Sequence, residues 1–239
     1  MPTPNRFFLR RVVVLAVLSC SIGACDLFAN RPYFYVRPIA QYTRLPSSSR
    51  ASFFYHSGST VSSAGVISYD TTRFSASSDG LGGGLSVGFV WGQNQSFEMG
   101  AEGTITRFTG SYIITQNNPY SSATYSGNMK VENVLASFRH YFGKKEAKLR
   151  PYYGAVLGNT DVSFSKPAGT PATSFSTALE GNRLTGGLGL GLVYKVAEAT
   201  QIEAGYRIMQ SERITFMGSS NSSLYEKSHT FSFSLRQHF

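Results

Sequence analysis

Charged side chains are few in this sequence, and several of them recur on one face of alternating segments. Charged residues make up 15% of the chain, whereas about 25% is usual for a soluble domain. Three glutamates and four arginines share the parity of the small residues in their segments: Glu98, Glu102, Arg139, Arg150, Glu203, Arg207 and Arg236. Carboxylates close to guanidinium groups could relay protons or gate a passage. Because a buried charge must be paired, a structural network of ion pairs is the simpler interpretation.

The remaining side chains with catalytic potential are the histidines of the chain: His56, His140, His229 and His238. A hydrolase needs a histidine beside a serine or an aspartate in a defined cluster. His56–Ser57 and Ser228–His229 are adjacent in sequence, but such pairs arise by chance in a serine-rich chain. The sequence therefore favours a protein that is not an enzyme.

Neither a cofactor nor a metal ion is expected from these residue types. No spacing of cysteines and histidines fits a metal site. The stretch Gly186–Gly191 has the glycine content of a dinucleotide-binding loop, but leucines alternate with its glycines and no helix follows. We interpret it as a strand with small residues on its inner face.

The net charge of the chain, +9, would suit a protein that binds nucleic acid. The basic residues are scattered, however, and their longest runs are the pairs Arg10–Arg11 and Lys144–Lys145. The chain is instead rich in glycine, with 24 residues, and in rings, with 14 tyrosines and 18 phenylalanines. Such a composition argues against nucleic acid and indicates that part of the surface faces a solvent other than water.

Residues 1–29 are predicted to form a secretory signal peptide. Basic residues in Arg6–Arg11 precede an apolar stretch, Val12–Ala24, which is shorter than the roughly 20 residues of a membrane-spanning helix. Cleavage after Ala29 leaves a domain of residues 30–239. The alternative is a lipobox-like sequence that ends before Cys25, in which case Cys25 is lipidated. No cysteine follows position 25, so the folded part has no disulfide.

The last ten residues, Thr230–Phe239, show the pattern on which the fold prediction rests. Phe231, Phe233, Leu235 and Phe239 share one parity, while the other parity holds small or charged residues, as in a strand with one apolar face. Seven further segments of about the length of a tilted membrane strand repeat this alternation: Tyr33–Tyr42, Leu81–Trp91, Phe97–Phe108, Asn133–Phe142, Leu149–Val162, Leu184–Lys195 and Ile202–Ile208.

The connections between these eight segments alternate in length. Three are short turns: Gly92–Ser96, Gly143–Lys148 and Ala197–Thr200. Four are expected to be long polar loops: Thr43–Asp79, Thr109–Ser126, Ser165–Glu180 and a loop near Gly218–Ser223. Membrane barrels have tight turns on one side and long loops on the other, so both termini should lie on the short-turn side.

Composition decides which face of the predicted strands points outward. A soluble barrel would present lysine, glutamate and aspartate to water, whereas the polar face here holds glycine, serine and threonine, which suit a narrow lumen. The apolar face carries more bulky residues than a lumen of eight strands accepts. Aromatic residues flank the short turns or the terminus, as in an interfacial girdle: Trp91, Phe97, Phe142, Tyr194 and Phe239. The apolar face should therefore contact lipid.

The leader, the eight alternating segments, the short turns and the terminal phenylalanine together resemble small bacterial outer-membrane β-barrels of the OmpA-barrel, OmpX and opacity-protein kind. The resemblance covers residues 30–239 and implies an all-β, closed antiparallel barrel of eight strands with short periplasmic turns and long extracellular loops. It also implies internal ion pairs, and recognition of the terminal strand with Phe239 by the barrel-assembly machinery. The first connection is longer than such barrels need, and a hairpin of Ser52–Tyr55 with Val66–Tyr69 would make ten strands.

We therefore expect a monomeric, integral protein of the bacterial outer membrane, surrounded by lipid and lipopolysaccharide. Its loops, above all Thr43–Asp79, would contact an unknown extracellular ligand in adhesion or would support envelope integrity. A small-solute channel is the alternative, and it needs a wider lumen; a soluble lipoprotein barrel anchored through Cys25 and an outer-membrane enzyme are less favoured. Arg107 and Lys130, toward the long-loop ends, could meet lipopolysaccharide phosphates or be ordinary rim charges.

Overall fold

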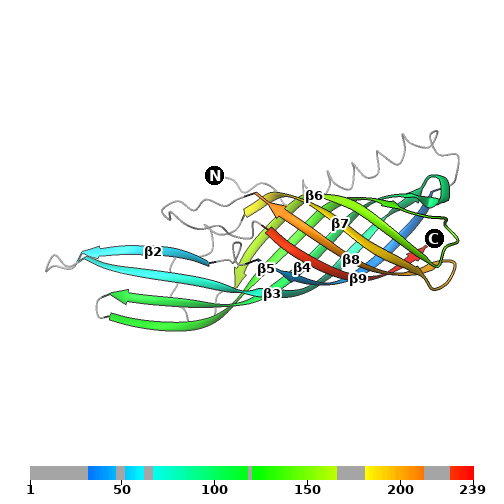
Figure 1. Ribbon diagram of the computed structural model, residues 1–239. Coiled ribbons are helices and arrows are strands. Elements are labelled where there is room, and N and C mark those ends of the chain that lie inside the picture. Colours follow the sequence, from blue (N-terminus) through cyan, green and yellow to red (C-terminus); the bar gives the residue numbers. More distant parts are fainter. Residues whose placement is uncertain (1–31, 47–51, 62–66, 118–119, 166–180, 213–226) are drawn as a thin grey trace.

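The computed structural model describes residues 32–46, 52–61, 67–117, 120–165, 181–212 and 227–239. This part of the chain contains nine strands and a short 3₁₀ turn, η2 (Gln93–Gln95), as Figure 1 shows. The strands are β1 (Tyr33–Arg44), β2 (Ser52–Val61), β3 (Ile67–Trp91), β4 (Phe97–Asn117), β5 (Tyr120–Tyr141), β6 (Leu149–Ser165), β7 (Gly181–Lys195), β8 (Thr200–Ser211) and β9 (Lys227–His238). Among the described residues, no helix has the length and apolar character needed to cross a membrane.

Eight of these nine strands close into a barrel. Neighbours in sequence pair antiparallel from β3 to β9, and β9 pairs with β1. The ring closes between β1 and β3, whose register runs from Tyr33↔Val90 to Arg44↔Asp79. The predicted closed antiparallel barrel of eight strands is confirmed. Closure leaves no strand edge within the barrel, so its backbone N–H and C=O groups are paired without water.

The ninth strand, β2, lies outside the barrel and, among the described residues, pairs only with β3. Its register runs from Ser52↔Ser75 to Val61↔Ile67, so the additional hairpin considered from the sequence is present. β3 nevertheless continues from this hairpin into the barrel wall as one strand of 25 residues. The hairpin lengthens an existing wall strand, and the alternative of ten barrel strands is wrong.

Two stretches that were expected to be loops contain long strands. Thr43–Asp79 holds β2 and half of β3, and Thr109–Ser126 holds the paired ends of β4 and β5. With 25, 21 and 22 residues, β3, β4 and β5 are about twice as long as β1, β8 and β9, with 12 each. The serines in these stretches suggested loops, but the threonine and aromatic residues between them favour strands once neighbouring strands supply hydrogen-bond partners.

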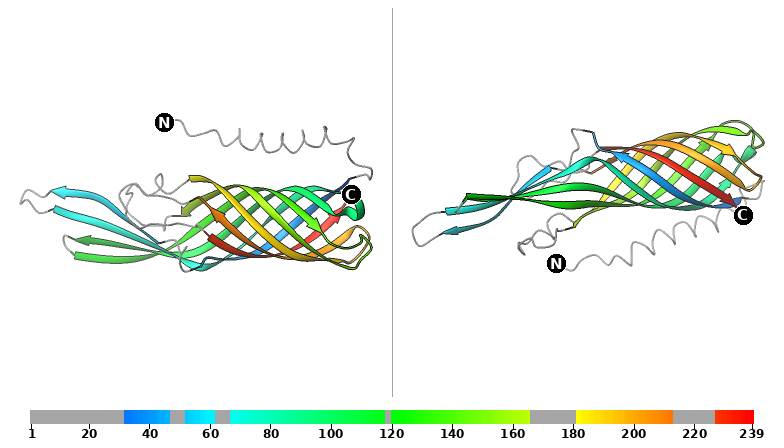
Figure 2. Two further views of the ribbon diagram at one scale, coloured as in Figure 1. Left: turned by 45° about the horizontal axis from the view of Figure 1, so that its top comes forward. Right: turned by 90° about the horizontal axis from the view of Figure 1, so that it is seen from below.

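The extra halves of these strands, together with β2, form a four-stranded sheet that projects beyond the barrel on the long-loop side (Figures 1 and 2). We call it the outer sheet: β2, residues 67–76 of β3, 110–117 of β4 and 120–127 of β5. Its boundary with the barrel is a bulge, where residues 77–79 of β3 face one residue of β4 between Ala76↔Gly110 and Gly80↔Phe108. Bulges bend and twist a strand, which suits a sheet that leaves a curved wall.

Several predicted features lie outside the described residues. They are the leader, residues 1–29 with Cys25, most of Ser165–Glu180, and Gly218–Ser223. The three short turns are present, and each joins two strands at the same end of the barrel as Phe239.

Candidate functional site

All seven charged residues that the alternation places on the inner face lie in the lumen. The three glutamates are at most 2% exposed, and the side chain of Arg207 is 12% exposed. They are contributed by five strands: Glu98 and Glu102 by β4, Arg139 by β5, Arg150 by β6, Glu203 and Arg207 by β8, and Arg236 by β9. Successive residues of a strand point to opposite faces, so the parity shared with small residues places each of these groups inside.

Arg37 on β1 is a lumen residue that the sequence prediction missed. Its side chain is fully buried, and its guanidinium group lies 3.2 Å from Glu98 and 3.1 Å from Glu203. It also donates a hydrogen bond to Ser86 Oγ (3.0 Å). The segment Tyr33–Tyr42 is bulky on both faces, which hid the inner face. A usable signal was present, because a lone charge in a membrane strand faces the interior.

Arg37 stands at the centre of an ion-pair cluster on the short-turn half of the lumen. Glu98 also pairs with Arg236 and lies 3.7 Å from Arg139. Glu203 pairs with Arg139 and lies 3.3 Å from Arg236. Each of these carboxylates therefore contacts three arginines from different strands, and the cluster ties β1, β4, β5, β8 and β9 together across the barrel.

A second pair extends this cluster toward the long-loop side. Arg207 lies 2.8 Å from Glu102, and Arg37 lies 3.9 Å from the same carboxylate. Glu203 and Arg207, four residues apart on β8, do not pair with each other, and each finds its partners across the barrel.

Arg150 is buried but takes no part in these ion pairs. Its guanidinium group donates to the backbone carbonyl oxygens of Asn94 (3.0 Å) and Gln95 (3.2 Å) in the β3–β4 turn. Its contacts differ from the shared ion pairs expected for the interior charges, because the position at the start of β6 lies next to that turn. Arg150 therefore fastens one short turn to the bottom of the barrel.

Tyrosine hydroxyl groups complete the hydrogen bonding of the cluster. Tyr35 donates to Glu98 (2.8 Å), Tyr141 donates to the same carboxylate, and Tyr152 donates to Glu203 (3.0 Å). The ring of Tyr152 reaches across two glycines of the wall. A Cβ built on Gly205 would lie 2.5 Å from the Tyr152 hydroxyl, and one on Gly191 would lie 2.6 Å from its ring. Glycine in the wall thus makes room for the groups that fill the lumen.

The rest of the lumen is filled up to its mouth. Above the charges lie an apolar group of Leu135, Val156 and Met209 and then a layer of threonine, asparagine and glutamine side chains. Near the long-loop end, further fully buried apolar residues close the passage: Phe108, Met129, Val131 and Val162. The lumen pocket beside the charges has a volume of about 30 Å³. A water molecule needs roughly 10–15 Å³ of such space, so the pocket is no continuous channel.

The outer face of the barrel is apolar on every strand. Large exposed side chains represent all eight: Phe34, Leu81, Ile105, Val134, Leu157, Leu188, Ile208 and Phe233. Leu81 and Leu188 are exposed to 72% and 71%. A continuous apolar surface of this kind around a protein is unfavourable in water and favourable in hydrocarbon.

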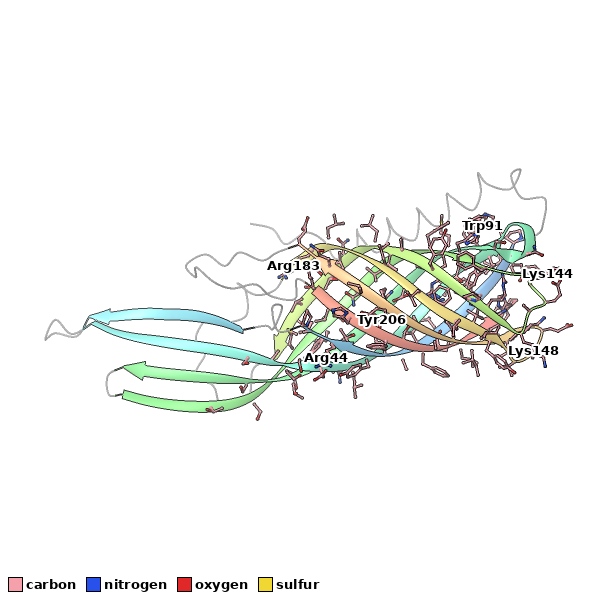
Figure 3. All side chains as sticks on the ribbon, in the orientation of Figure 1. Arg44, Trp91, Lys144, Lys148, Arg183 and Tyr206 are labelled. Carbon is pink, nitrogen blue, oxygen red and sulfur yellow. The ribbon has the colours of Figure 1, made fainter. Side chains whose placement is uncertain are left out.

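Aromatic side chains border this apolar belt near the short turns. Trp91 and Phe97 stack with their centroids 6.0 Å apart, and His140 lies between Phe97 (5.0 Å) and Phe142 (5.2 Å). Tyr194 and Phe239 are exposed on the same side. Figure 3 shows Trp91 near the end that carries Lys144 and Lys148, opposite to Arg44 and Arg183.

A second aromatic group marks the other border of the belt. The hydroxyl of Tyr206 and Nδ1 of His229 are hydrogen-bonded (2.6 Å), and Phe231 packs on Tyr206 with a centroid distance of 4.9 Å. On β5 the belt lies between His140 and Lys130, ten positions apart. At about 3.3 Å per residue and a tilt of about 40°, this gives about 25 Å, the height of the apolar band in outer-membrane barrels.

The barrel spans a membrane. A belt of this height, with aromatic borders and a closed hydrogen-bonded ladder, is the architecture of the bacterial outer membrane. The chain matches no protein-family model, and no curated protein is significantly similar to it.

Several solved structures share the fold at low sequence identity. Neisserial surface protein A (NspA) is 18% identical with a TM-score of 0.48, over 88% of this chain and 100% of that chain. Ail of Yersinia pestis, solved in complex with the heparin analogue sucrose octasulfate, is 13% identical with a TM-score of 0.45, over 88% and 100%. The N-terminal barrel domain of Pseudomonas aeruginosa OprF is 13% identical with a TM-score of 0.40, over 87% and 100%. Similarity at this level concerns the fold and carries no function.

The histidines do not assemble with serine and aspartate in the described residues. His140 belongs to the aromatic border, His229 bonds to Tyr206, and His238 is half-buried at the end of β9. The side chain of His56 lies outside the described part. Within that part, no group of three or more histidine, cysteine, aspartate or glutamate residues is arranged to hold a metal ion.

The two rim cations predicted to meet lipopolysaccharide occupy directly paired positions, Arg107↔Lys130, on the outer face. Lys130 also forms an ion pair with Glu132 (3.0 Å). Like charges opposite each other on a sheet repel, so an anionic lipid group between them would be stabilising.

Proposed function

We propose that this protein is a non-enzymatic surface protein whose outer sheet binds a partner outside the cell, with the barrel as its membrane anchor. The observation that carries the proposal is the length of β3, β4 and β5. A strand of about ten residues crosses the membrane, so roughly half of each of these strands is available outside it. Outer-sheet residues add nothing to closure of the barrel, and a role in contact with another molecule accounts for them.

The register of the outer sheet supports a binding surface. Phe53, Phe74, Tyr112 and Tyr125 occupy directly paired positions on four neighbouring strands. Directly paired residues share a face, so one row across the sheet is aromatic throughout. On the other face the neighbouring row is Ser52, Ser75, Ser111 and Ser126. Aromatic residues in a polar setting are the common composition of protein-recognition surfaces.

The filled lumen argues against a channel as the main role. The cluster around Arg37 and the apolar residues around Phe108 occupy the lumen at two levels. A solute would have to displace both groups in order to pass.

A trimmed barrel tests this proposal. Leu45 and Ser78 are joined by a backbone hydrogen bond of 2.7 Å, and Gly110 pairs with Gly127, so tight turns at these two places would remove the outer sheet and keep the barrel. Cells that display the intact or the trimmed protein would be compared for adherence to epithelial cell layers and extracellular-matrix coatings. We expect adherence to require the outer sheet. Equal adherence by equally abundant intact and trimmed proteins would contradict the proposal.

A further inference from the structure

Positive charge exceeds negative charge in the described part of the lumen. Six arginines point inward, Arg37, Arg139, Arg150, Arg183, Arg207 and Arg236, against three glutamates, Glu98, Glu102 and Glu203. Two of the arginines lie at the ends of the barrel: Arg150 donates to turn carbonyls, and Arg183 lies at the long-loop end (Figure 3). The central cluster therefore contains four guanidinium groups and three carboxylates. The tyrosine hydroxyl groups in contact with it donate hydrogen bonds and supply no negative charge.

The shared ion pairs leave donor capacity in this cluster. Nε of Arg37 and Nε of Arg236 are buried and have no hydrogen-bond partner among the described residues. Arg207 has one close carboxylate partner, at 2.8 Å. A cation in excess inside an apolar shell is costly, because neither water nor a counter-charge compensates it.

The lumen pocket of about 30 Å³ lies beside this surplus charge. Arg37, Arg139 and Arg207 line it, together with the carboxylates of Glu102 and Glu203. Three wall glycines contribute to its lining: Gly154, Gly189 and Gly205. Because these positions on three neighbouring strands carry no side chain, space remains next to three guanidinium groups.

We propose that this pocket binds one small monovalent anion of chloride size. A halide is only slightly larger than a water molecule, so it fits a space that holds about two waters. The three guanidinium groups outnumber the two carboxylates that share the pocket, and a bound anion brings the central cluster to neutrality. Large anions cannot enter a space of this volume, which makes the site selective by size.

Anomalous X-ray diffraction on crystals grown in bromide locates such an anion directly. We expect a bromide peak in the pocket, within contact of the guanidinium groups of Arg37, Arg139 and Arg207. A map with no anomalous peak there, or with water alone on these groups, would overturn the proposal.

Thermal unfolding in detergent gives an independent test in solution. Potassium chloride is compared with potassium gluconate at equal ionic strength, because gluconate is too large for the pocket. We expect the midpoint in chloride to rise by about 3 °C for each tenfold increase above the dissociation constant, as linkage requires. Identical midpoints in the two salts would count against an anion site.

Two arginine variants separate the site from general salt effects. Arg207→Gln removes one positive charge from the pocket and leaves the central cluster neutral, so the difference between chloride and gluconate should largely disappear. Arg183→Gln removes a lumen arginine that does not line the pocket, and the difference should persist. Loss of the chloride response in both variants, or in neither, would overturn the assignment. If Arg207→Gln does not fold, the bromide map of the wild-type protein decides.

Discussion

The barrel and the outer sheet are built from the same three strands, but different interactions hold them. In the barrel, β3 pairs with β1 and β4, the ladder closes, and the inner residues form ion pairs and hydrogen bonds across the lumen. In the outer sheet, β2 and β5 have one strand neighbour each among the described residues. The sequence changes at the boundary as well, because β3 has five glycines between Gly80 and Gly88 and none between Ile67 and Asp79. The lower half is shaped to enclose a lumen, whereas the upper half presents side chains on two open faces.

This contrast predicts that changes in the barrel alter assembly and stability, and that changes in the outer sheet alter binding. The largest effect should follow deletion of Phe239. Resemblance implies that the barrel-assembly machinery recognises the terminal aromatic strand, so most of the shortened protein should remain unassembled in the periplasm. Membrane fractionation measures this. Normal levels of the shortened protein in the outer membrane would contradict it.

The structure separates this assembly effect from a loss of stability. The Phe239 side chain is 76% exposed, and its N–H donates to the carbonyl oxygen of Phe34 (2.9 Å). Loss of that one backbone hydrogen bond should cost only about 1 kcal/mol in the protein refolded in detergent.

Replacing Arg37 should cause the largest loss of unfolding free energy. Arg37→Ala leaves Glu98 and Glu203 with fewer partners, and breaking a buried ion pair costs about 3–5 kcal/mol. The loss should be smaller near about pH 4, because a carboxylate left without a partner can take up a proton. Urea unfolding in detergent at both pH values measures it.

Arg44→Ala is the matched control on the same strand. The Arg44 side chain is 67% exposed and lies 4.0 Å from Asp79, and an exposed pair of this kind is worth at most about 1 kcal/mol. Equal losses for Arg37→Ala and Arg44→Ala would mean that the lumen cluster does not hold the barrel together.

A smaller effect is expected where tyrosine crosses the glycine wall. Gly205→Ala places a methyl group 2.5 Å from the Tyr152 hydroxyl, and overpacking of this kind costs about 1–3 kcal/mol. Tyr152→Phe removes the hydroxyl, so in a double-mutant cycle the two changes should be less costly together than their sum. Gly103→Ala is the control, because nothing lies within 4 Å of its new methyl group. Strict additivity would contradict the close packing of Tyr152 on Gly205.

Substitution in the outer sheet should have the smallest effect on stability. Tyr112→Ser changes a position of the aromatic row outside the barrel, and we expect the unfolding free energy of the barrel to change by no more than about 0.5 kcal/mol. Adherence should fall in the same variant. A stability loss comparable to that of Arg37→Ala would mean that sheet and barrel fold as one unit.

The same contrast explains how far the sequence alone predicts this structure. Strand β7 was evident from its pattern, because leucines face lipid and glycines face a crowded lumen in strict alternation. Arg37 was missed because both faces of β1 carry bulky residues near it. The outer sheet was missed for another reason: a strand with water on both faces has no apolar face, so hydroxyl-rich strands and loops have similar compositions. The identity of the ion-pair partners depends on which strands meet across the barrel, and alternation within one strand does not contain that information.

Electrical recording across planar lipid bilayers tests most directly whether the barrel is a closed anchor. The lumen is filled by the cluster around Arg37 and by the apolar residues around Phe108, so the wild-type protein should show small or no steady currents. The trimmed protein without the outer sheet should be equally silent, because both groups lie within the barrel. Large, steady currents from the wild-type protein would mean that the lumen is open to water, and the protein would then be a channel rather than a closed anchor.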